Sequence, residues 1–308
     1  MSSLQSRLIY FVLRNRHLMK FHWKRESWDL NTSIPRFRQE CEDAAKRAKI
    51  PDGIDVEPVT AAGLRAEWVL PRGAAKDKVI LYTIGGGYVS GSCNDHRAMV
   101  AKITKGSGVS TLLFDHRLAP EDPFPAALED AVAAYGWLLA QGVSPSKIII
   151  VGDSAGGGLC LATLVALRDQ GLPLPAAAAA LSPWTDLALT GDSYRTKLKA
   201  SIDPPGMSIV CSKYYAGEND PRLPWISPLY GDLRGLPPLF ICVGTNETML
   251  DDSTRFAEKA TAAGVDVTLR VWEGMVHCFP LMAPLFPEAT LAMNEICTFI
   301  NTHVGEVK

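Results

Sequence analysis

The chain has 308 residues, enough for one large domain with a sizeable core and a smaller lid. Its 31 Lys and Arg residues and 33 Asp and Glu residues give a net charge of −2, so overall charge does not favour nucleic acid as a partner. The seven cysteines include no C-x-x-C pair and no zinc-site spacing, which indicates free thiols, a reducing cytoplasm and no metal ion.

The N-terminal segment, residues 2–49, has a helical pattern that contains the apolar run LIYFVL at 8–13. The run is too short to span a bilayer and lacks a small-residue cleavage site after it, so we expect neither an integral membrane segment nor a signal peptide. One face of this helix is apolar and the other is basic. Such a face could enter a membrane surface, but we expect it to pack on the protein's own lid. The apolar positions are Leu4, Leu8, Phe11 and Leu18.

From residue 54 onward, strand and helix patterns alternate. Their order predicts a mainly parallel sheet of eight strands with helices between most of them. The alanine run at 174–181 favours a helix by propensity alone, but its place in the alternation predicts a strand. The predicted strands are 54–60, 64–70, 78–84, 108–115, 148–151, 174–181, 239–244 and 267–273. The predicted helices are 95–105, a helix opening at 124–130, 155–168, 205–215, 253–263 and 287–303.

The alternation breaks after residue 186, where prolines and tyrosines predict an insertion above the sheet. We therefore divide the chain into four segments. Residues 1–48 are the N-terminal part of a helical cap, 49–186 and 226–308 form the α/β core, and 187–225 are the cap insertion.

A strand–turn–helix pattern surrounds Ser154. The apolar run at 148–151 is followed by Gly152-Asp153-Ser154-Ala155-Gly156, which matches the G-x-S-x-G turn that lifts a nucleophilic serine clear of a sheet. Bulk at either glycine would prevent the helix from packing against the strand it has just left. The following helix places N-terminal N–H groups beside Ser154, where they can stabilise a substrate oxyanion. In isolation the motif could be only a tight strand-to-helix connection, so its context must decide.

The matching histidine and acid must lie downstream, just after strands, because reactive groups collect at the carboxyl ends of parallel strands. His277 follows the last strand and is our candidate general base, although a surface-loop histidine is the alternative. For the acid we favour Glu247 over Asp251 and Asp252, because acids at a helix start have a capping role available to them. The other histidines fit less well: His17, His22, His96, His116 and His303.

Three glycines, Gly85, Gly86 and Gly87, follow the buried strand 78–84. Glycines in this position let backbone N–H groups approach a ligand closely. A phosphate-binding loop is the rival interpretation, but the sequence has neither G-K-[ST] nor a G-x-G-x-x-G that opens a helix.

These residues together resemble the hormone-sensitive lipase family of α/β-hydrolases. The resemblance covers nearly all of 78–280 and rests on GGGYVSGS at 85–92, DHRLAPE at 115–121, GDSAGGGL at 152–159 and SPWTDL at 182–187. It implies an α/β-hydrolase fold with a helical cap and an oxyanion hole formed by the N–H groups of Gly86, Gly87 and Ala155. It also implies that a homodimer is common and that neither metal nor organic cofactor is needed.

One position departs from the family pattern. The family block is usually H-G-G-G, whereas this chain has Ile84 before the glycines. The family histidine is expected to brace the loop through hydrogen bonds, which isoleucine cannot make. The three N–H donors are still available, so we expect catalysis to survive, with apolar packing or water holding the loop instead. A misplaced N–H donor would cost about 3 kcal/mol in the transition state.

The sequence therefore predicts a serine carboxylesterase acting on short- to medium-chain acyl esters. The alternatives are hydrolysis of amides, lactones or carbohydrate acetyl groups, and a non-catalytic ligand-binding protein on the same fold. Retention of Ser154, Glu247 and His277 argues against the last of these. Aromatic residues that could line the substrate pocket are Tyr88, Trp184, Tyr214 and Tyr215.

Overall fold

The computed structural model describes residues 2–19 and 26–304, and within them a single sheet contains eight strands. Its spatial order is β1-β2-β4-β3-β5-β6-β7-β8. Only the β1–β2 and β2–β4 pairs are antiparallel, so the sheet is mainly parallel, as predicted. The strands are β1 (Ile54–Ala61), β2 (Leu64–Pro71), β3 (Val79–Thr83), β4 (Ser110–Phe114), β5 (Ile148–Asp153), β6 (Ala177–Leu181), β7 (Leu239–Gly244) and β8 (Val267–Trp272).

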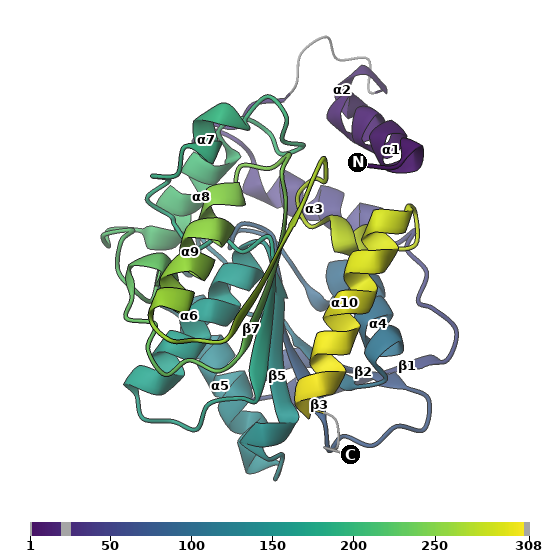
Figure 1. Ribbon diagram of the computed structural model, residues 1–308, viewed down its shortest axis with the longest axis vertical. Coiled ribbons are helices and arrows are strands. Elements are labelled where there is room, and N and C mark those ends of the chain that lie inside the picture. Colours follow the sequence, from purple (N-terminus) through teal and green to yellow (C-terminus); the bar gives the residue numbers. More distant parts are fainter. Residues whose placement is uncertain (1, 20–25, 305–308) are drawn as a thin grey trace.

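Helices cover both faces of the sheet. In Figure 1, α4 and α10 lie on one side of the strands and α5, α6 and α9 on the other. Each face has its own apolar cluster of buried residues, so the strands between them are buried on both sides. The covering helices are α4 (Cys93–Ser107), α5 (Ala126–Ala140), α6 (Ala155–Asp169), α9 (Leu250–Ala262) and α10 (Pro287–Val304).

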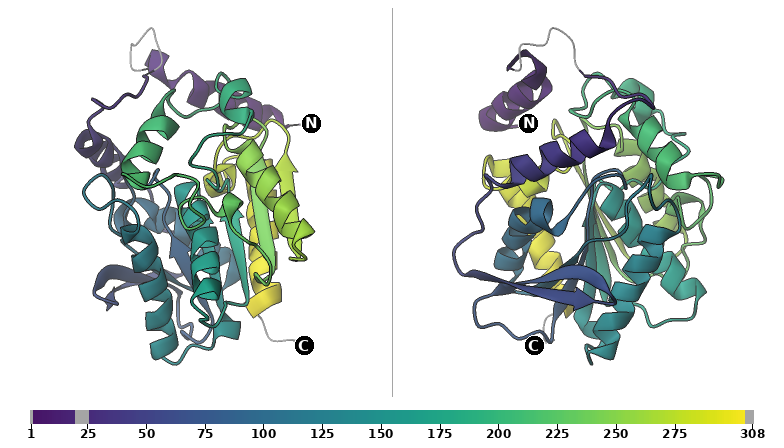
Figure 2. Two further views of the ribbon diagram at one scale, coloured as in Figure 1. Left: turned by 90° about the vertical axis from the view of Figure 1, so that its left-hand side faces the viewer. Right: turned by 180° about the vertical axis from the view of Figure 1, so that it is seen from behind.

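The remaining helices gather at one end of the molecule. Figure 2 shows α3, in purple, crossing above the sheet at the same end as α8, in green. This end faces the carboxyl ends of the parallel strands, where Ser154 follows β5. These helices are α1 (Leu4–Arg14), α2 (Arg16–Met19), α3 (Ile34–Ala45), α7 (Ser193–Thr196) and α8 (Met207–Ala216).

Most predicted elements are confirmed, including the alanine strand β6. Its five residues are fully or almost fully buried between β5 and β7, so pairing and burial override the helical propensity of alanine. The continuous N-terminal helical pattern is wrong in part, because residues 26–33 are not helical and 20–25 lie outside the described residues. Pro125 is the N-cap of α5 and not part of its first turn.

The apolar face of α1 does not pack as expected. Leu4 is 81% exposed, Leu8 64% and Phe11 63%, and Leu18 beyond α1 is 53% exposed. The opposite face, with Ile9, packs on the protein instead. The expectation that the apolar stripe of Leu4, Leu8, Phe11 and Leu18 packs on the protein's own lid is therefore wrong.

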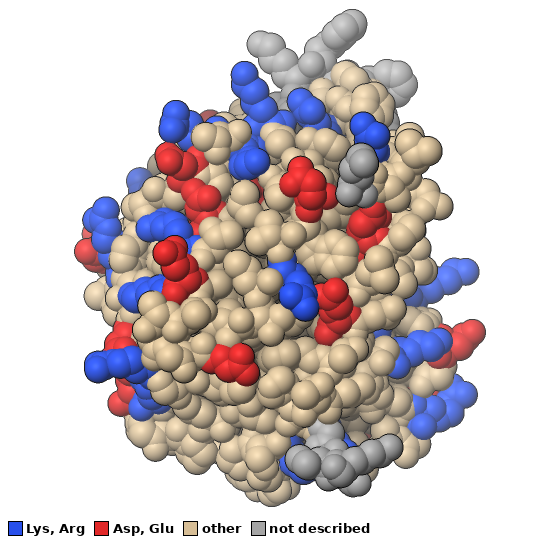
Figure 3. Space-filling model, viewed as in Figure 1, with Lys and Arg blue, Asp and Glu red and all other residues tan. Residues whose placement is uncertain are grey.

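The surface carries charges of both signs. On the face drawn in Figure 3, Lys and Arg side chains lie among Asp and Glu, with wide uncharged areas between them, in keeping with the small net charge. In the described part of the chain, no helix has both the length and the apolar character needed to cross a bilayer.

Candidate active site

Ser154 occupies a strained turn between β5 and α6. Its backbone angles are φ 56° and ψ −124°, a region that residues with side chains rarely adopt. The glycines on either side allow this turn. A Cβ atom on Gly152 would collide with the carbonyl of Gly156, and one on Gly156 would collide with the backbone of Thr83 and Ile84. The close packing predicted for these two glycines is confirmed.

His277 connects the serine to a buried acid. Its Nε2 atom lies 2.8 Å from Ser154 Oγ, and its Nδ1 atom lies 2.7 Å from Glu247 Oε2. A carboxylate can only accept, so Nδ1 carries the proton and Nε2 is left to accept from the serine hydroxyl. This arrangement allows His277 to withdraw the Ser154 proton. The surface-loop alternative for His277 is not what the structure shows, since the ring lies between these two partners.

Glu247 is fully buried in the loop between β7 and α9. Its Oε1 atom accepts hydrogen bonds from the Gly244 N–H at 2.6 Å and from Ser182 Oγ at 2.9 Å. Ser182 in turn accepts from the N–H of Cys278 at 3.0 Å. One serine hydroxyl therefore joins the acid loop to the histidine loop and fixes the distance between Glu247 and His277.

The rival acids have other partners. Asp251 accepts from the N–H of Ser193 at 2.9 Å. Asp252 is buried, and its Oδ2 accepts from the N–H groups of Thr185 and Asp186. Burial, reinforced by the charge of Asp186, raises the pKa of Asp252 to about 8. Asp251 and Asp252 therefore connect α9 to the segment that follows β6. Neither side chain makes the capping hydrogen bond to α9 that the sequence allowed.

The surroundings of His277 favour its protonated form. Burial lowers the pKa of an imidazole, but Cys278, Asp203 and Glu247 raise it, and the net pKa of His277 lies well above the ordinary value. Burial also raises the pKa of the Cys278 thiol to about 11, so Cys278 is uncharged near neutral pH. We therefore assign the upward shift to the two carboxylates.

The glycine loop after β3 faces the same space. Gly86 and Gly87 have φ angles of +120° and +67°, which favour glycine, and both line the cavity that contains Ser154. A Cβ atom on Gly86 would collide with the Ser90 backbone, and one on Gly87 would lie 2.8 Å from Cys211 Sγ on α8. The loop thus admits only glycine at these positions.

Polar groups lie on both sides of this loop where the family histidine is missing. His116 Nδ1 lies 2.9 Å from the Arg117 carbonyl oxygen and its Nε2 lies 3.4 Å from the Ile84 carbonyl oxygen, and a neutral ring can donate to only one of them. On the other side, the N–H of Gly85 donates to Asp153 Oδ1 at 3.2 Å. The Ile84 side chain itself is 1% exposed within an apolar cluster. Apolar packing was expected here, whereas the contacts from His116 and Asp153 were not.

Asp153 belongs to a buried charged cluster beside the nucleophile. The Tyr82 hydroxyl donates to Asp153 Oδ1 at 2.9 Å, His96 Nε2 lies 3.5 Å from the same oxygen, and His96 Nδ1 contacts Asp95. Burial lowers the pKa of His96, but the two carboxylates outweigh it and raise the pKa to about 10. The ring is therefore an imidazolium near neutral pH. Burial raises the pKa of Asp153, but the charge of His96 and the hydrogen bonds from His96 and Tyr82 lower it by more. The net pKa of Asp153 therefore lies below its ordinary value.

A cavity of about 310 Å³ opens at Ser154 and is mostly apolar in its lining. Of the four aromatic residues proposed for it, only Trp184 lines it. Tyr88 and Tyr215 are instead buried and stacked with ring centroids 3.6 Å apart, and the Tyr214 hydroxyl donates to the Leu30 carbonyl at 3.0 Å. The three tyrosines therefore do not line this cavity, because the stacked pair fills the space between the cap and α6.

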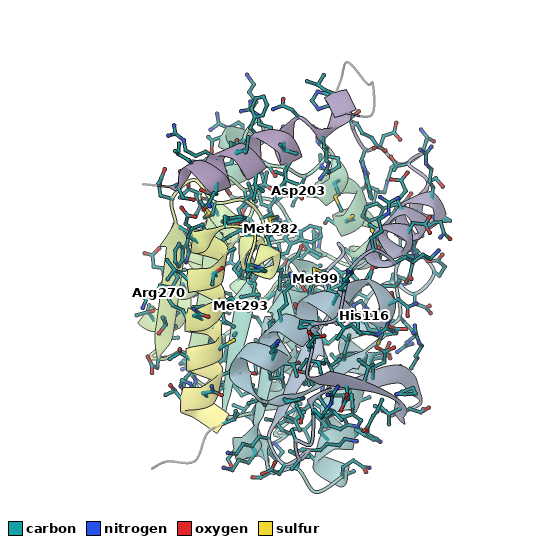
Figure 4. All side chains as sticks on the ribbon, turned by 90° about the vertical axis from the view of Figure 1, so that its right-hand side faces the viewer. Met99, His116, Asp203, Arg270, Met282 and Met293 are labelled. Atoms are coloured by element: carbon teal, nitrogen blue, oxygen red, sulfur yellow. The ribbon has the colours of Figure 1, made fainter. Side chains whose placement is uncertain are left out.

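Methionines supply much of the cavity wall. Figure 4 shows Met282 and Asp203 near the end of the molecule that carries the N-terminal helices, with Met99 deeper below them. The thioether side chain is flexible, so such a wall adapts to ligands of different shape. The described residues that line the cavity are Gly86, Gly87, His96, Met99, Asp153, Ser154, Trp184, Asp203, Met207, Ser208, Cys211, Met249, His277, Cys278, Leu281 and Met282.

The sequence reasoning missed His96, Asp153 and Ser182. Ser182 directly follows β6, so the rule that site residues follow strands would have found it. Asp153 occupies the position before Ser154 in the G-x-S-x-G motif, which specifies no residue type there. His96 lies in α4, and no local pattern indicates that this face of α4 reaches the nucleophile. Among the described residues, no group of three or more His, Cys, Asp or Glu side chains could hold a metal ion.

Comparisons with known proteins agree with this geometry. Residues 80–281 match a family described as having the alpha/beta hydrolase fold. An acetyl-hydrolase of Streptomyces hygroscopicus is 40% identical over 294 residues, which cover 94% of this chain and 96% of that protein.

Two solved structures are similar over nearly the whole chain. An esterase of the bacterial hormone-sensitive lipase family has 41% identity and a TM-score of 0.90, covering 99% of this chain and 100% of that one. The esterase EstE5 in a crystal soaked with p-nitrophenyl butyrate has 43% identity and a TM-score of 0.89, covering 98% and 99%. The chain belongs to the hormone-sensitive lipase family of α/β-hydrolases.

Proposed function

We propose that this carboxylesterase hydrolyses short- to medium-chain acyl esters through Ser154, His277 and Glu247, by way of an acyl-enzyme intermediate. The observation that carries the proposal is the hydrogen-bonded chain from Ser154 Oγ through His277 to the buried carboxylate of Glu247. A nucleophile, a base and a group that orients the base are the elements that acyl transfer requires.

In the first step, His277 Nε2 takes the hydroxyl proton while Ser154 Oγ bonds to the ester carbonyl carbon. The tetrahedral intermediate then collapses as the bond to the alcohol oxygen breaks, and His277 returns the proton to the leaving alkoxide. In the second step His277 takes a proton from water and the hydroxide attacks the acyl carbon. The bond to Ser154 Oγ then breaks as His277 returns the proton to that oxygen, which releases the carboxylic acid. Glu247 stabilises the imidazolium formed in each step.

The oxyanion of each intermediate would lie among the N–H groups of Gly86, Gly87 and Ala155. Support comes from the shared cavity of Ser154 and the two glycines, and from the position of Ala155 at the first turn of α6. Preorganised donors of this kind typically contribute about 3 kcal/mol each to transition-state stabilisation.

The size of the cavity supports a short or medium acyl chain. At about 310 Å³ it lies at the low end of the range of roughly 300–1,000 Å³ found for small-molecule sites. The named substrates of relatives point the same way, because one is an acetyl-hydrolase and another was soaked with a butyrate ester.

We also propose that residues 1–48 and 187–225 act as a cap on the 49–186 and 226–308 core. Cys211 of α8, which packs against Gly87 of the oxyanion loop, supports a cap that shapes the substrate site. A cytoplasmic location and a homodimer remain predictions. The first is supported by seven free cysteines.

Hydrolysis of p-nitrophenyl esters from acetate to palmitate, measured for the wild-type chain and for Ser154→Ala, tests the proposal. We expect kcat/KM to be greatest at short or medium chains and to be lost in the variant. A folded wild-type protein without activity on any ester, or equal activity in Ser154→Ala, would overturn it. p-Nitroanilide and lactone substrates in the same assay separate the competing hydrolase activities.

A further inference from the structure

Helix α1 turns an apolar stripe toward solvent. Leu4, Leu8 and Phe11 are spaced as successive turns of one helix face, and their exposed fractions are 81%, 64% and 63%. Val12 extends the stripe and is 42% exposed. Isolated exposed leucines are ordinary, but four large apolar side chains on one face of an eleven-residue helix form a patch that requires an explanation.

The opposite face of α1 is fixed to the protein, so the exposed stripe is not a consequence of a loose helix. The Tyr10 hydroxyl donates to the Ala200 carbonyl at 3.0 Å, and Ser3 Oγ donates to Glu288 of α10 at 2.8 Å. Ile9 and Tyr10 also border a small cavity with Phe286. The helix is held with its apolar stripe outward.

The sequence of the N-terminal segment carries charge of one sign, although the Glu288 carboxylate of α10 lies against Ser3 at the start of α1. Residues 1–25 contain six Lys and Arg residues and no Asp or Glu, although the whole chain has a net charge of −2. On α1, Arg7 and Arg14 lie on the side of the helix next to the stripe, and both are exposed. An apolar stripe bordered by cations is the pattern of a helix that lies in the plane of an anionic lipid surface.

The segment that packs against α1 also reaches the active-site cavity. Phe286, which packs against α1, follows Leu285, and Leu285 is 64% exposed. Met282, which precedes Leu285 closely in the chain, lines the cavity at Ser154. Figures 1 and 4 place α1 and Met282 at the same end of the molecule. A surface bound by α1 would therefore lie next to the route into the cavity.

We propose that α1 docks the protein on the surface of an anionic phospholipid bilayer, with Leu4, Leu8 and Phe11 entering the boundary between headgroups and acyl chains. Arg7 and Arg14 contact the lipid phosphates from the edge of the stripe. The helix lies on the bilayer and does not cross it, since its eleven residues are too few for a span. A second copy of the chain fits less well, because two such basic segments would repel one another.

Vesicle flotation of the full-length protein tests this proposal without using its catalytic activity. The probes are phosphatidylcholine vesicles, with and without phosphatidylglycerol, at low and high salt. We expect binding to the phosphatidylglycerol vesicles that weakens as salt rises. Leu8→Ser with Phe11→Ser should reduce the partition coefficient at least about tenfold, because it removes most of the inserted apolar area. Arg7→Gln with Arg14→Gln should reduce binding only to the anionic vesicles.

Matched changes at the other end of the molecule are the controls. Leu172→Ser alters a 39% exposed leucine after α6, and Lys105→Gln with Lys147→Gln removes two cations distant from α1. These variants should bind as the wild type does. All variants should hydrolyse p-nitrophenyl acetate within about twofold of the wild type, which shows that they are folded.

Three outcomes would overturn the proposal. The first is a wild-type protein that does not float with anionic vesicles. The second is an equal loss of binding in Leu172→Ser and in the α1 variants. The third is a dimer that becomes a monomer in the α1 variants without any vesicle binding, which would assign the stripe to self-association.

Discussion

Glu247 of the candidate active site and Leu4 of α1 lie in opposite surroundings, one buried and one exposed. The carboxylate of Glu247 is fully buried and has hydrogen-bonding partners on both oxygens, whereas the apolar side chain of Leu4 is 81% exposed. In the catalytic loops, burial makes each polar contact strong and its loss costly. On the outer face of α1, the apolar side chains are mostly exposed, so they contribute little to packing within the described part of the chain. The first region is fixed by the fold, and the second is available to a partner.

Loss of the nucleophile or base should have the largest effect. Ser154→Ala and His277→Ala should each lower kcat roughly a millionfold, because the residues of such a chain act as a unit. The double variant should be no slower than either single one. Steady-state kinetics with p-nitrophenyl butyrate measure this, and additive losses in the double variant would show that the two residues act independently.

Glu247→Gln tests the acid separately. We expect kcat to fall about 10⁴-fold, because the ring loses its fixed tautomer and the imidazolium loses its counter-charge. Activity requires neutral His277, so kcat/KM of the wild type falls as pH drops through the raised pKa of this ring. Without the carboxylate that pKa falls, and the acid limb of the pH profile should move to lower pH. An unchanged limb would contradict the assignment of Glu247.

The buried cluster beside the nucleophile should contribute mainly to stability. His96→Gln removes the cation between Asp95 and Asp153, and we expect the free energy of unfolding to fall by about 3 kcal/mol near neutral pH. The folded pKa of about 10 lies above the unfolded value of ~6.5. The contribution is therefore complete below pH 6.5 and declines as pH rises toward 10. Urea unfolding of both proteins at several pH values should show the difference shrinking over that window.

The contact from His116 to Ile84 predicts a smaller catalytic effect. His116→Phe keeps a ring of similar shape but loses the nitrogen 3.4 Å from the Ile84 carbonyl. We expect kcat to fall about tenfold with KM unchanged, because the loop would hold its N–H donors less accurately. An increase in KM alone would indicate a structural role only.

The smallest effect is expected on the outer face of α1. Leu8→Ser should change the free energy of unfolding by no more than about 0.5 kcal/mol. Leu159→Ala, at a fully buried position in α6, should cost about 3 kcal/mol. Thermal unfolding of both variants measures the contrast. Equal losses would mean that the outer face of α1 is packed in solution.

Most strands and the candidate residues Ser154, Glu247 and His277 were predictable from local sequence, whereas β6 also needed its place in the strand–helix alternation. A buried β-branched run predicts β5, the two glycines predict the turn at Ser154, and chain order limits the acid and the histidine. The structure adds that Ser182 joins their two loops, because its hydroxyl donates to Glu247 and accepts from the N–H of Cys278.

Other features depend on packing between distant segments, which local patterns do not encode. From sequence alone, the apolar stripe of α1 could face either the core or the solvent. The contacts of Tyr10 and Ser3 with the rest of the protein decide its direction. Tyr88 lies in the loop after β3 and Tyr215 lies in α8, so their stacking could not be predicted from either segment alone. His96 reaches the site because α4 packs against β2 and β4, a relation of tertiary structure.

The most direct test of the central claim is the site of covalent modification by a p-nitrophenyl alkylphosphonate. This reagent traps a serine activated by a neighbouring base as a stable analogue of the tetrahedral intermediate. Intact-mass and peptide mass spectrometry should show one phosphonyl group, on Ser154, formed in step with loss of activity and absent in Ser154→Ala. Inactivation with the group on another residue, or full activity after Ser154 is modified, would contradict the account.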